Sequence, residues 1–247
     1  MMRLFMGLLL LGVLPLRADV DALAAVRRAR ELIGPALWAE VVRLDRAGPG
    51  VVHLLVFELE DRLWGYEPGV GTQSLSLYGG RIEQDKADLG PLLREIEPGY
   101  RGHTVVDPAW APEPSGLASS RLPAGCFIES VARLRDMVAR GQAPDEARLL
   151  AYYAPVATGT RGHTVLYYER GGRRFLFDPE RPAAPLRLPR YLPDDALQAA
   201  RVATAEAGFT VPRRALFLPL RLPGPGRPAF AVAAGDPPPD GHTAMER

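Results

Sequence analysis

The sequence predicts an α+β protein in which a β-rich N-terminal region precedes a helix that packs on an antiparallel sheet. Three observations lead to this fold class. Residues 38–77 show β-like patterns punctuated by Gly and Pro. Residues 126–140 carry apolar side chains at helical spacing. Residues 163–178 hold two apolar, aromatic runs around Gly171-Gly172, which is typical of a β-hairpin.

Composition sets the bounds on domain number and on the class of partner. The chain has 247 residues, enough for one large domain or two small ones, and 47% of them are hydrophobic. The formal net charge of +1 and the scattered arginines give no nucleic-acid footprint. Four histidines and one cysteine show no metal-ligand spacing. We therefore expect no metal, no cofactor and no nucleic-acid partner.

The N-terminus reads as a signal peptide covering residues 1–18. Arg3 precedes an apolar run, residues 4–16, that is short for a membrane span and typical of a signal core. A buried helix is the alternative interpretation. No cysteine follows the run, which argues against a lipid anchor. We expect export to the periplasm or beyond, with no membrane association once the signal is removed.

The region 19–107 is predicted to be rich in β-structure. Gly34-Pro35 ends the first helix pattern, and Gly and Pro clusters at 48–50, 68–71 and 79–80 punctuate the strand patterns. The expected elements are a helix at 21–32, strands at 51–57, 62–66 and 74–77, and a short helix at 91–96.

A Pro-, Ser- and Ala-rich loop at 108–123 then leads into a second domain at 124–222. The expected elements are a helix at 126–140, a short helix or turn at 143–148, a strand at 149–153, the hairpin, a helix at 194–207 and a strand at 215–220. The tail at 223–247 has many Pro and Gly residues and few large apolar ones, so we expect it to be disordered.

The single cysteine, Cys126, stands at the predicted start of a helix. Pro123 and Gly125 do not fit inside that helix, so it begins at or beside Cys126. A thiol in the first helical turn faces unpaired backbone N–H groups and the positive end of the helix dipole, which favours the thiolate. Cys126 is therefore a candidate nucleophile, and a buried structural cysteine is the alternative.

The hairpin supplies a base and an acid for that nucleophile. If Arg170 pairs with Arg173, then Asp178 lies opposite Val165, two residues from His163 on the same face of the sheet. The carboxylate can then accept a hydrogen bond from one imidazole nitrogen and fix the tautomer, as a cysteine nucleophile requires of its base.

This arrangement resembles the transglutaminase-like branch of the papain-like cysteine enzymes. The resemblance runs over residues 122–180, through GCFIESVARLR at the thiol, the strand ARLLAYY, and GHTVLYYE and FLFDP. It implies that Cys126 is the nucleophile, His163 the base and Asp178 the orienting acid. It also implies acyl transfer through a thioester, ending in peptide or amide hydrolysis or in crosslinking of glutamine to an amine.

The sequence departs from the family pattern near the thiol. Many members place an aromatic residue close before the cysteine, where this chain has Pro-Ala-Gly. Papain-like relatives polarise the oxyanion with an upstream glutamine, and none stands between Gln84 and Cys126. Gln73 could fold in from the N-terminal region, and the backbone N–H of Cys126 is also available.

Three other histidines are expected to take no part in the chemistry. His103 shares the pentapeptide RGHTV with His163, but no hairpin follows it, so we interpret it as a strand end or loop. His53 lies in an apolar strand and His242 in the tail.

We therefore expect an exported peptidase, amidase or protein-glutamine acyltransferase that acts on a protein or peptide, with cell-wall peptide as one candidate. The alternative is a noncatalytic transglutaminase-like protein that binds partners or acts as a scaffold. Its contact surface would consist of four aromatic residues, Trp38, Trp64, Tyr66 and Tyr78. The simpler interpretation is that these residues belong to the hydrophobic core.

Overall fold

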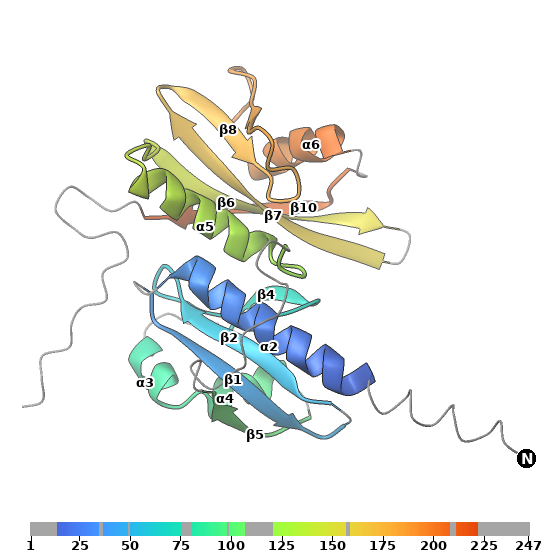
Figure 1. The fold of residues 1–247 in the computed structure, drawn as a ribbon. Coiled ribbons are helices and arrows are strands. Elements are labelled where there is room, and N and C mark those ends of the chain that lie inside the picture. Colours follow the sequence, from blue (N-terminus) through green and yellow to red (C-terminus); the bar gives the residue numbers. More distant parts are fainter. Residues whose placement is uncertain are drawn as a thin grey trace, which may run out of the picture.

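Two antiparallel sheets and five helices make up the described part of a computed structural model of the chain (Figure 1). The structure describes residues 14–34, 37–48, 50–75, 81–97, 99–106, 121–156, 159–207 and 211–221. The fold is mixed α+β, as the sequence predicts.

The N-terminal sheet has the strand order β4-β3-β2-β1-β5, and neighbouring strands are antiparallel. Its strands are β1 (Ala39–Arg46), β2 (Val52–Glu58), β3 (Leu63–Glu67), β4 (Gly71–Ser74) and β5 (Tyr100–Val105). Strand β2 is buried almost throughout because apolar side chains leave it on both faces.

The C-terminal sheet has the order β10-β6-β7-β8-β9. Its strands are β6 (Glu146–Val156), β7 (Gly159–Arg170), β8 (Arg173–Phe177), β9 (Leu186–Arg187) and β10 (Arg214–Leu220). Arg170 pairs with Arg173, as predicted from the glycine pair. Both turn glycines have positive φ, 58° and 66°, which a two-residue I′ turn requires.

Helices cover both faces of each sheet. They are α2 (Leu14–Ile33), α3 (Ile82–Ala87), α4 (Gly90–Ile96), α5 (Cys126–Ala139) and α6 (Ala196–Ala207). Helices α2 and α5 lie against each other between the two sheets, and α6 covers the far face of the C-terminal sheet (Figure 1). None of the helices described is long and apolar enough to cross a membrane.

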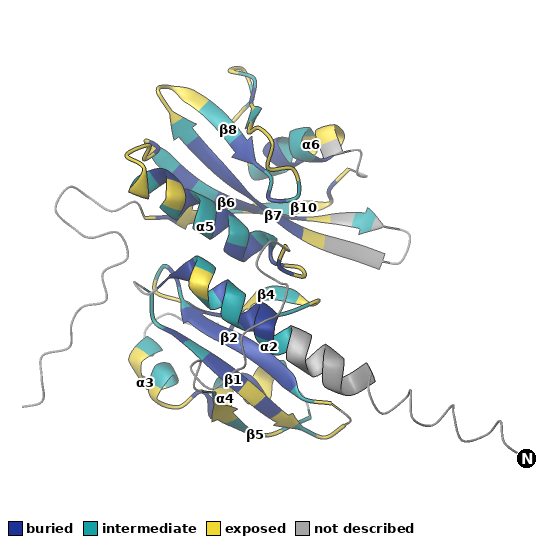
Figure 2. Ribbon diagram, in the orientation of Figure 1, coloured by how far each residue is buried: buried dark blue, intermediate teal, exposed yellow. Residues whose placement is uncertain are grey.

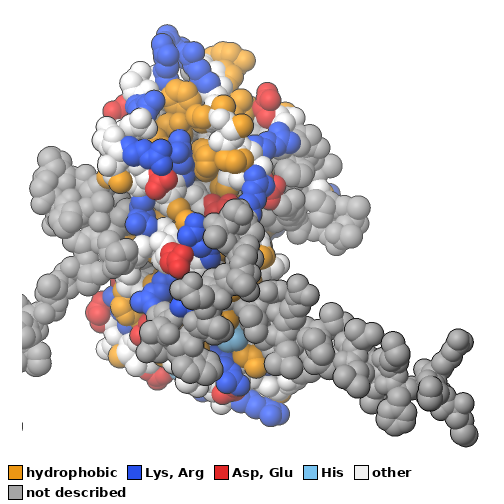
Figure 3. Space-filling view, viewed as in Figure 1, with side chains coloured by type: hydrophobic (Ala, Val, Ile, Leu, Met, Phe, Trp, Pro, Cys, Tyr) orange, Lys and Arg blue, Asp and Glu red, His pale blue; other side chains and the backbone are white. Residues whose placement is uncertain are grey.

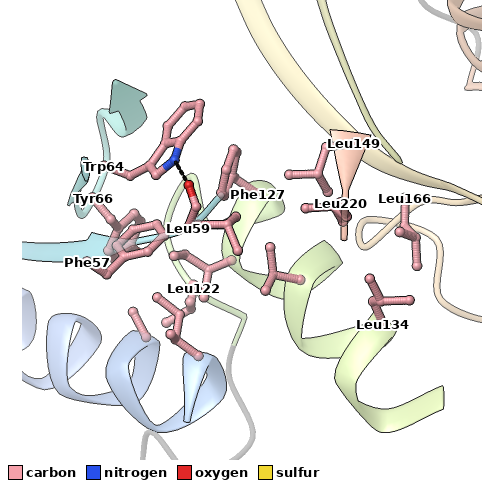
Figure 4. Close-up of a cluster of buried hydrophobic side chains, with 14 of the residues drawn as sticks. Phe57, Leu59, Trp64, Tyr66, Leu122, Phe127, Leu134, Leu149, Leu166 and Leu220 are labelled. Carbon is pink, nitrogen blue, oxygen red and sulfur yellow. Dashed lines mark hydrogen bonds between the residues drawn. The ribbon is translucent and has the colours of Figure 1, made fainter. Parts of the chain in front are cut away.

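One hydrophobic cluster joins the two halves of the molecule. It draws buried side chains from α2 and the N-terminal sheet and from α5 and the C-terminal sheet. The Phe127 ring of α5 lies 4.8 Å from the Trp64 ring and 6.2 Å from the Phe57 ring, between centroids. Figure 4 shows Phe127 between these side chains and Leu149 and Leu220 of the other sheet.

Burial is concentrated where the elements face one another. Figure 2 shows continuous burial along β2 and through the middle of β7, with exposed residues at the turns. Lys and Arg side chains are spread over the height of the visible face, interspersed with acidic and hydrophobic ones (Figure 3). This distribution agrees with the near-neutral net charge of +1.

Several predicted boundaries are wrong. Of the strand expected at 74–77, only Ser74 lies in β4, which begins at Gly71; Leu75 follows the strand, and residues 76–77 lie outside those described. Residues 143–148 form no helix, since β6 begins at Glu146. No separate strand was predicted for β1, and α3 and β9 were not predicted. The segment of β5 was interpreted as a strand end or loop.

Other predicted elements are confirmed, and some lie outside the residues that the structure describes. The predicted helices at 21–32, 91–96, 126–140 and 194–207 are confirmed with small shifts, and α2 begins earlier, at Leu14. The remainder of the expected signal peptide, 1–13, most of the loop at 108–123 and the tail at 223–247 lie outside the described residues.

Candidate active site

The turn that precedes Cys126 is held in place by hydrogen bonds to the N-terminal sheet. The Tyr66 hydroxyl donates to Pro123 O at 2.8 Å, and Gly69 N–H donates to the same carbonyl at 3.3 Å. Ala124 has φ of 54°, a left-handed value that costs a non-glycine residue about 1–2 kcal/mol. The N-terminal sheet thus fixes the approach to the thiol.

Cys126 is the first residue of α5, as predicted. The N-cap residue is Gly125, and no side chain caps the helix. The N–H groups of the first turn therefore have no intrahelical partner and no side-chain cap. The positive end of the helix dipole lies beside the thiol. Cys126 is half-buried, so it is neither fully enclosed in the core nor fully exposed to solvent.

His163 and Asp178 meet as the predicted hairpin register requires. His163 Nε2 lies 2.9 Å from Asp178 Oδ1. Because an ionised carboxylate only accepts hydrogen bonds, Nε2–H is the donor. The His163 ring is buried at 6% exposure and stands edge-on to Tyr152, with 5.5 Å between centroids. Asp178 thus fixes both the tautomer and the orientation of the ring.

The imidazole also contacts the thiol. Burial of the His163 ring opposes its protonation, but hydrogen bonds with Asp178 and Cys126, together with their negative charges, raise its pKa to about 9. The site therefore stabilises the protonated form of the His163 ring beside Cys126. Burial raises the pKa of Tyr66, and the charges of Glu129 and Cys126 add to that effect.

The carboxylate is held in its ionised form. Burial would raise the pKa of Asp178, but the hydrogen bond and charge of His163, the backbone N–H of Glu180 and the charge of Arg181 lower it. Glu180 N–H donates to Asp178 Oδ1 at 2.9 Å, which closes a turn through Pro179.

A second carboxylate that was not predicted, Glu180, also lies near the imidazole. Its Oε1 lies 3.9 Å from His163 Nδ1, the nitrogen that is not bonded to Asp178. The signal that could have revealed it is local, because Glu180 follows the Asp178-Pro179 turn directly.

A cleft of about 860 Å³ opens over these residues. Both halves of the molecule contribute walls: β3, β4 and the turn before α5 on one side, and β6, β7 and β10 on the other. Cys126, His163 and Glu180 line it, and Trp64 and Leu218 supply an apolar part.

The oxyanion candidates fall on the same cleft. Gln73 lines it from β4 and its side chain is exposed, while the backbone N–H of Cys126 belongs to the uncapped helix start. Gln73 pairs with Gly65, whose open side faces Leu54 and Leu75 in the cluster on the far face of the sheet. Because paired residues point to the same face of a sheet, the Gln73 side chain points to that far face. The backbone N–H of Cys126 is therefore the better donor to the oxyanion.

Two of the other histidines lie away from this cleft, and the third lies outside the described residues. His103 is in β5 opposite Leu44, and its Nδ1 lies 2.7 Å from the Tyr100 hydroxyl. His53 is buried in β2 opposite Arg43. His242 lies outside the described residues.

Of the four aromatics considered for a contact surface, Trp64 and Tyr66 belong to the central core and Trp38 packs on a second cluster. Tyr78 is not among the described residues. Over the described ranges, no three His, Cys, Asp or Glu side chains are grouped as metal ligands would be.

The chain matches no known family model, no curated protein and no solved structure.

Proposed function

We propose that the protein is an exported thiol acyl-transfer enzyme with a transglutaminase-like core, acting through Cys126, His163 and Asp178. The observation that carries the proposal is a cleft lined by a helix-start thiol and an imidazole, with the Asp178 carboxylate hydrogen-bonded to that imidazole. The substrate class is a protein or peptide. The apolar N-terminal run is the basis for export to the periplasm or beyond.

In the proposed reaction, the Cys126 thiolate attacks the carbonyl carbon of the substrate. The carbonyl π electrons move to oxygen, and the Cys126 N–H donates to the oxyanion. The oxyanion then collapses, the C–N bond breaks, and His163 Nδ1–H protonates the leaving amine. A thioester and a neutral imidazole remain.

The second half of the reaction regenerates the thiolate. Water or an amine gives a proton to His163 Nδ1 as it attacks the thioester carbonyl, and the C–S bond breaks. Asp178 holds the ring through Nε2 in both halves, so the proton moves only at Nδ1. The acceptor decides between hydrolysis and crosslinking.

The test measures alkylation of Cys126 by iodoacetamide at pH 6.5, followed by mass spectrometry. An ordinary thiol with pKa near 8.5 is about 1% thiolate at this pH. We expect the wild type to react about tenfold faster than an unfolded control. The gain is limited to this size because a stabilised thiolate is also a weaker nucleophile.

Two variants with matched sequence surroundings separate the roles of the two RGHTV copies. His163→Ala should bring the alkylation rate down to that of the unfolded control, whereas His103→Ala should change it less than twofold. Circular dichroism confirms that both variants fold. Equal effects of the two substitutions would refute the role of His163.

The noncatalytic alternative makes a different forecast. A protein that serves only as a scaffold would show a folded-state thiol no more reactive than the unfolded control at pH 6.5. It would also form no acyl-enzyme with p-nitrophenyl acetate, whereas the proposed enzyme gains an acetyl group on Cys126 and Cys126→Ser does not.

A further inference from the structure

Strand β4 forms one edge of the N-terminal sheet, and among the described strands it pairs with β3 alone. Leu75 N–H donates to Leu63 O at 2.8 Å, which makes these two residues a hydrogen-bonded pair of the ladder. Such pairs alternate with non-hydrogen-bonded ones. Thr72 pairs with Tyr66 in the alternate set, so its backbone N–H and C=O point away from β3.

This outer edge opens on the cleft that holds the thiol. Val70, Thr72 and Ser74 line the cleft together with Cys126. The Thr72 hydroxyl oxygen is buried and has no hydrogen-bond partner among the described residues. A buried hydroxyl without a partner is destabilising, and a bound polar group would offset that cost.

The start of β4 touches the turn that leads into Cys126. Gly69 N–H donates to Pro123 O, and a Cβ placed on Gly71 would lie 3.8 Å from the Ala124 Cβ. Thr72 follows Gly71, and Cys126 is two residues beyond Ala124. A chain laid along the outer edge of β4 therefore reaches the thiol within a few residues.

We propose that the substrate is an extended peptide that adds as a strand to the outer edge of β4, exchanging backbone hydrogen bonds with Thr72. The proposal rests on the proposed function and names its substrate class. Addition of a strand to an exposed edge satisfies main-chain donors and acceptors of both partners. A compact small amide gains nothing from this edge, whereas an extended chain of several residues does.

The main test uses the wild-type protein and a set of thiol-directed peptides. The probes are acetyl-tetra-alanyl chloromethyl ketone and analogues that each carry one N-methyl group on a different amide. The second-order rate of Cys126 alkylation by each probe is divided by the iodoacetamide rate. Methylation of the amide that donates to Thr72 O should lower this ratio about tenfold, and methylation of its neighbours less than threefold.

A pair of variants tests the same edge from the protein side. Thr72→Pro removes the outward N–H, which β3 does not use, and proline is tolerated on edge strands. It should lower the ratio of the peptide rate to the iodoacetamide rate about tenfold. Thr72→Ser keeps the N–H and the hydroxyl and should stay within twofold of wild type.

The outcomes separate the two proposals. Rapid iodoacetamide alkylation with equal sensitivity at all amides, or at none, overturns the β4 edge and leaves the thiol enzyme standing. Slow iodoacetamide alkylation at neutral pH removes the thiol enzyme itself. The N-methyl series is decisive even if Thr72→Pro fails to fold.

Discussion

The Ser130 hydroxyl donates to the backbone carbonyl of Thr164 across 3.4 Å, in the buried space between α5 and β7. Ser130 lies one helical turn after Cys126, and Thr164 directly follows His163. This bond therefore connects the helix that carries the thiol to the strand that carries the imidazole.

Ser130→Ala should loosen that connection without unfolding the protein. We expect a loss of about 1 kcal/mol in the free energy of unfolding, measured in urea, because one buried hydrogen bond disappears. The alkylation rate of Cys126 at pH 6.5 should fall a few-fold, less than in His163→Ala. An unchanged rate would mean that the bond contributes to stability alone.

The titration of His163 should depend on its two partners. Its pKa of about 9 is raised by Asp178 and Cys126 against the effect of burial. Asp178→Asn and Cys126→Ser should therefore each lower it. The measurement is the pH dependence of the histidine ring signals in NMR spectra.

Assignment of that signal requires a control. His163→Gln should remove only the resonance that titrates near pH 9, and His103→Gln a different one. A His163 resonance that titrates near 6.5 in the wild type would contradict the stabilised imidazolium.

Asp178 should contribute stability that is lost in acid. Its folded-state pKa is lower than the unfolded value, so the contribution is present above about pH 4 and vanishes as the pH falls through the folded pKa. Asp178→Asn should therefore be less stable than wild type at pH 5, and the gap should narrow as the pH falls below about 4. Urea unfolding at several pH values checks this. A gap that stays constant down to pH 2 would point to lost packing instead.

Phe127→Ala should destabilise both sheets together. Phe127 is 4% exposed and packs in the cluster that both halves share, so its truncation should cost about 3–5 kcal/mol. Far-UV circular dichroism and tryptophan fluorescence should report one coincident transition in urea. Leu216→Ala, with a side chain that is 46% exposed, serves as the control and should cost less than about 1 kcal/mol. Two separate transitions would show that the halves unfold independently.

The parts of the site that lie close in sequence could be predicted. The Gly171-Gly172 turn determines the hairpin register, and the register alone puts Asp178 beside His163. Pro123 and Gly125 determine where α5 begins, which places Cys126 in the first turn. Each of these inferences needs only local backbone geometry.

The parts that depend on distant packing could not be predicted. The cleft wall made by β3 and β4 exists because the Trp64 ring packs on Phe127, and no local pattern connects those residues. The boundary of β4 was missed for a related reason: its Gly71 resembles turn punctuation, while pairing with Glu67 makes it part of a strand.

The bond between Arg135 and the Leu32 carbonyl has a consequence for synthesis on the ribosome. The two residues are separated by 103 positions, and Arg135 closes the C-terminal end of α2. At about 5–20 residues per second, translation needs roughly 5–20 s to deliver the second partner after the first. During that interval α2 can already pack on β2, but the part of its surface that meets α5 in the folded protein stays uncovered and open to chaperones.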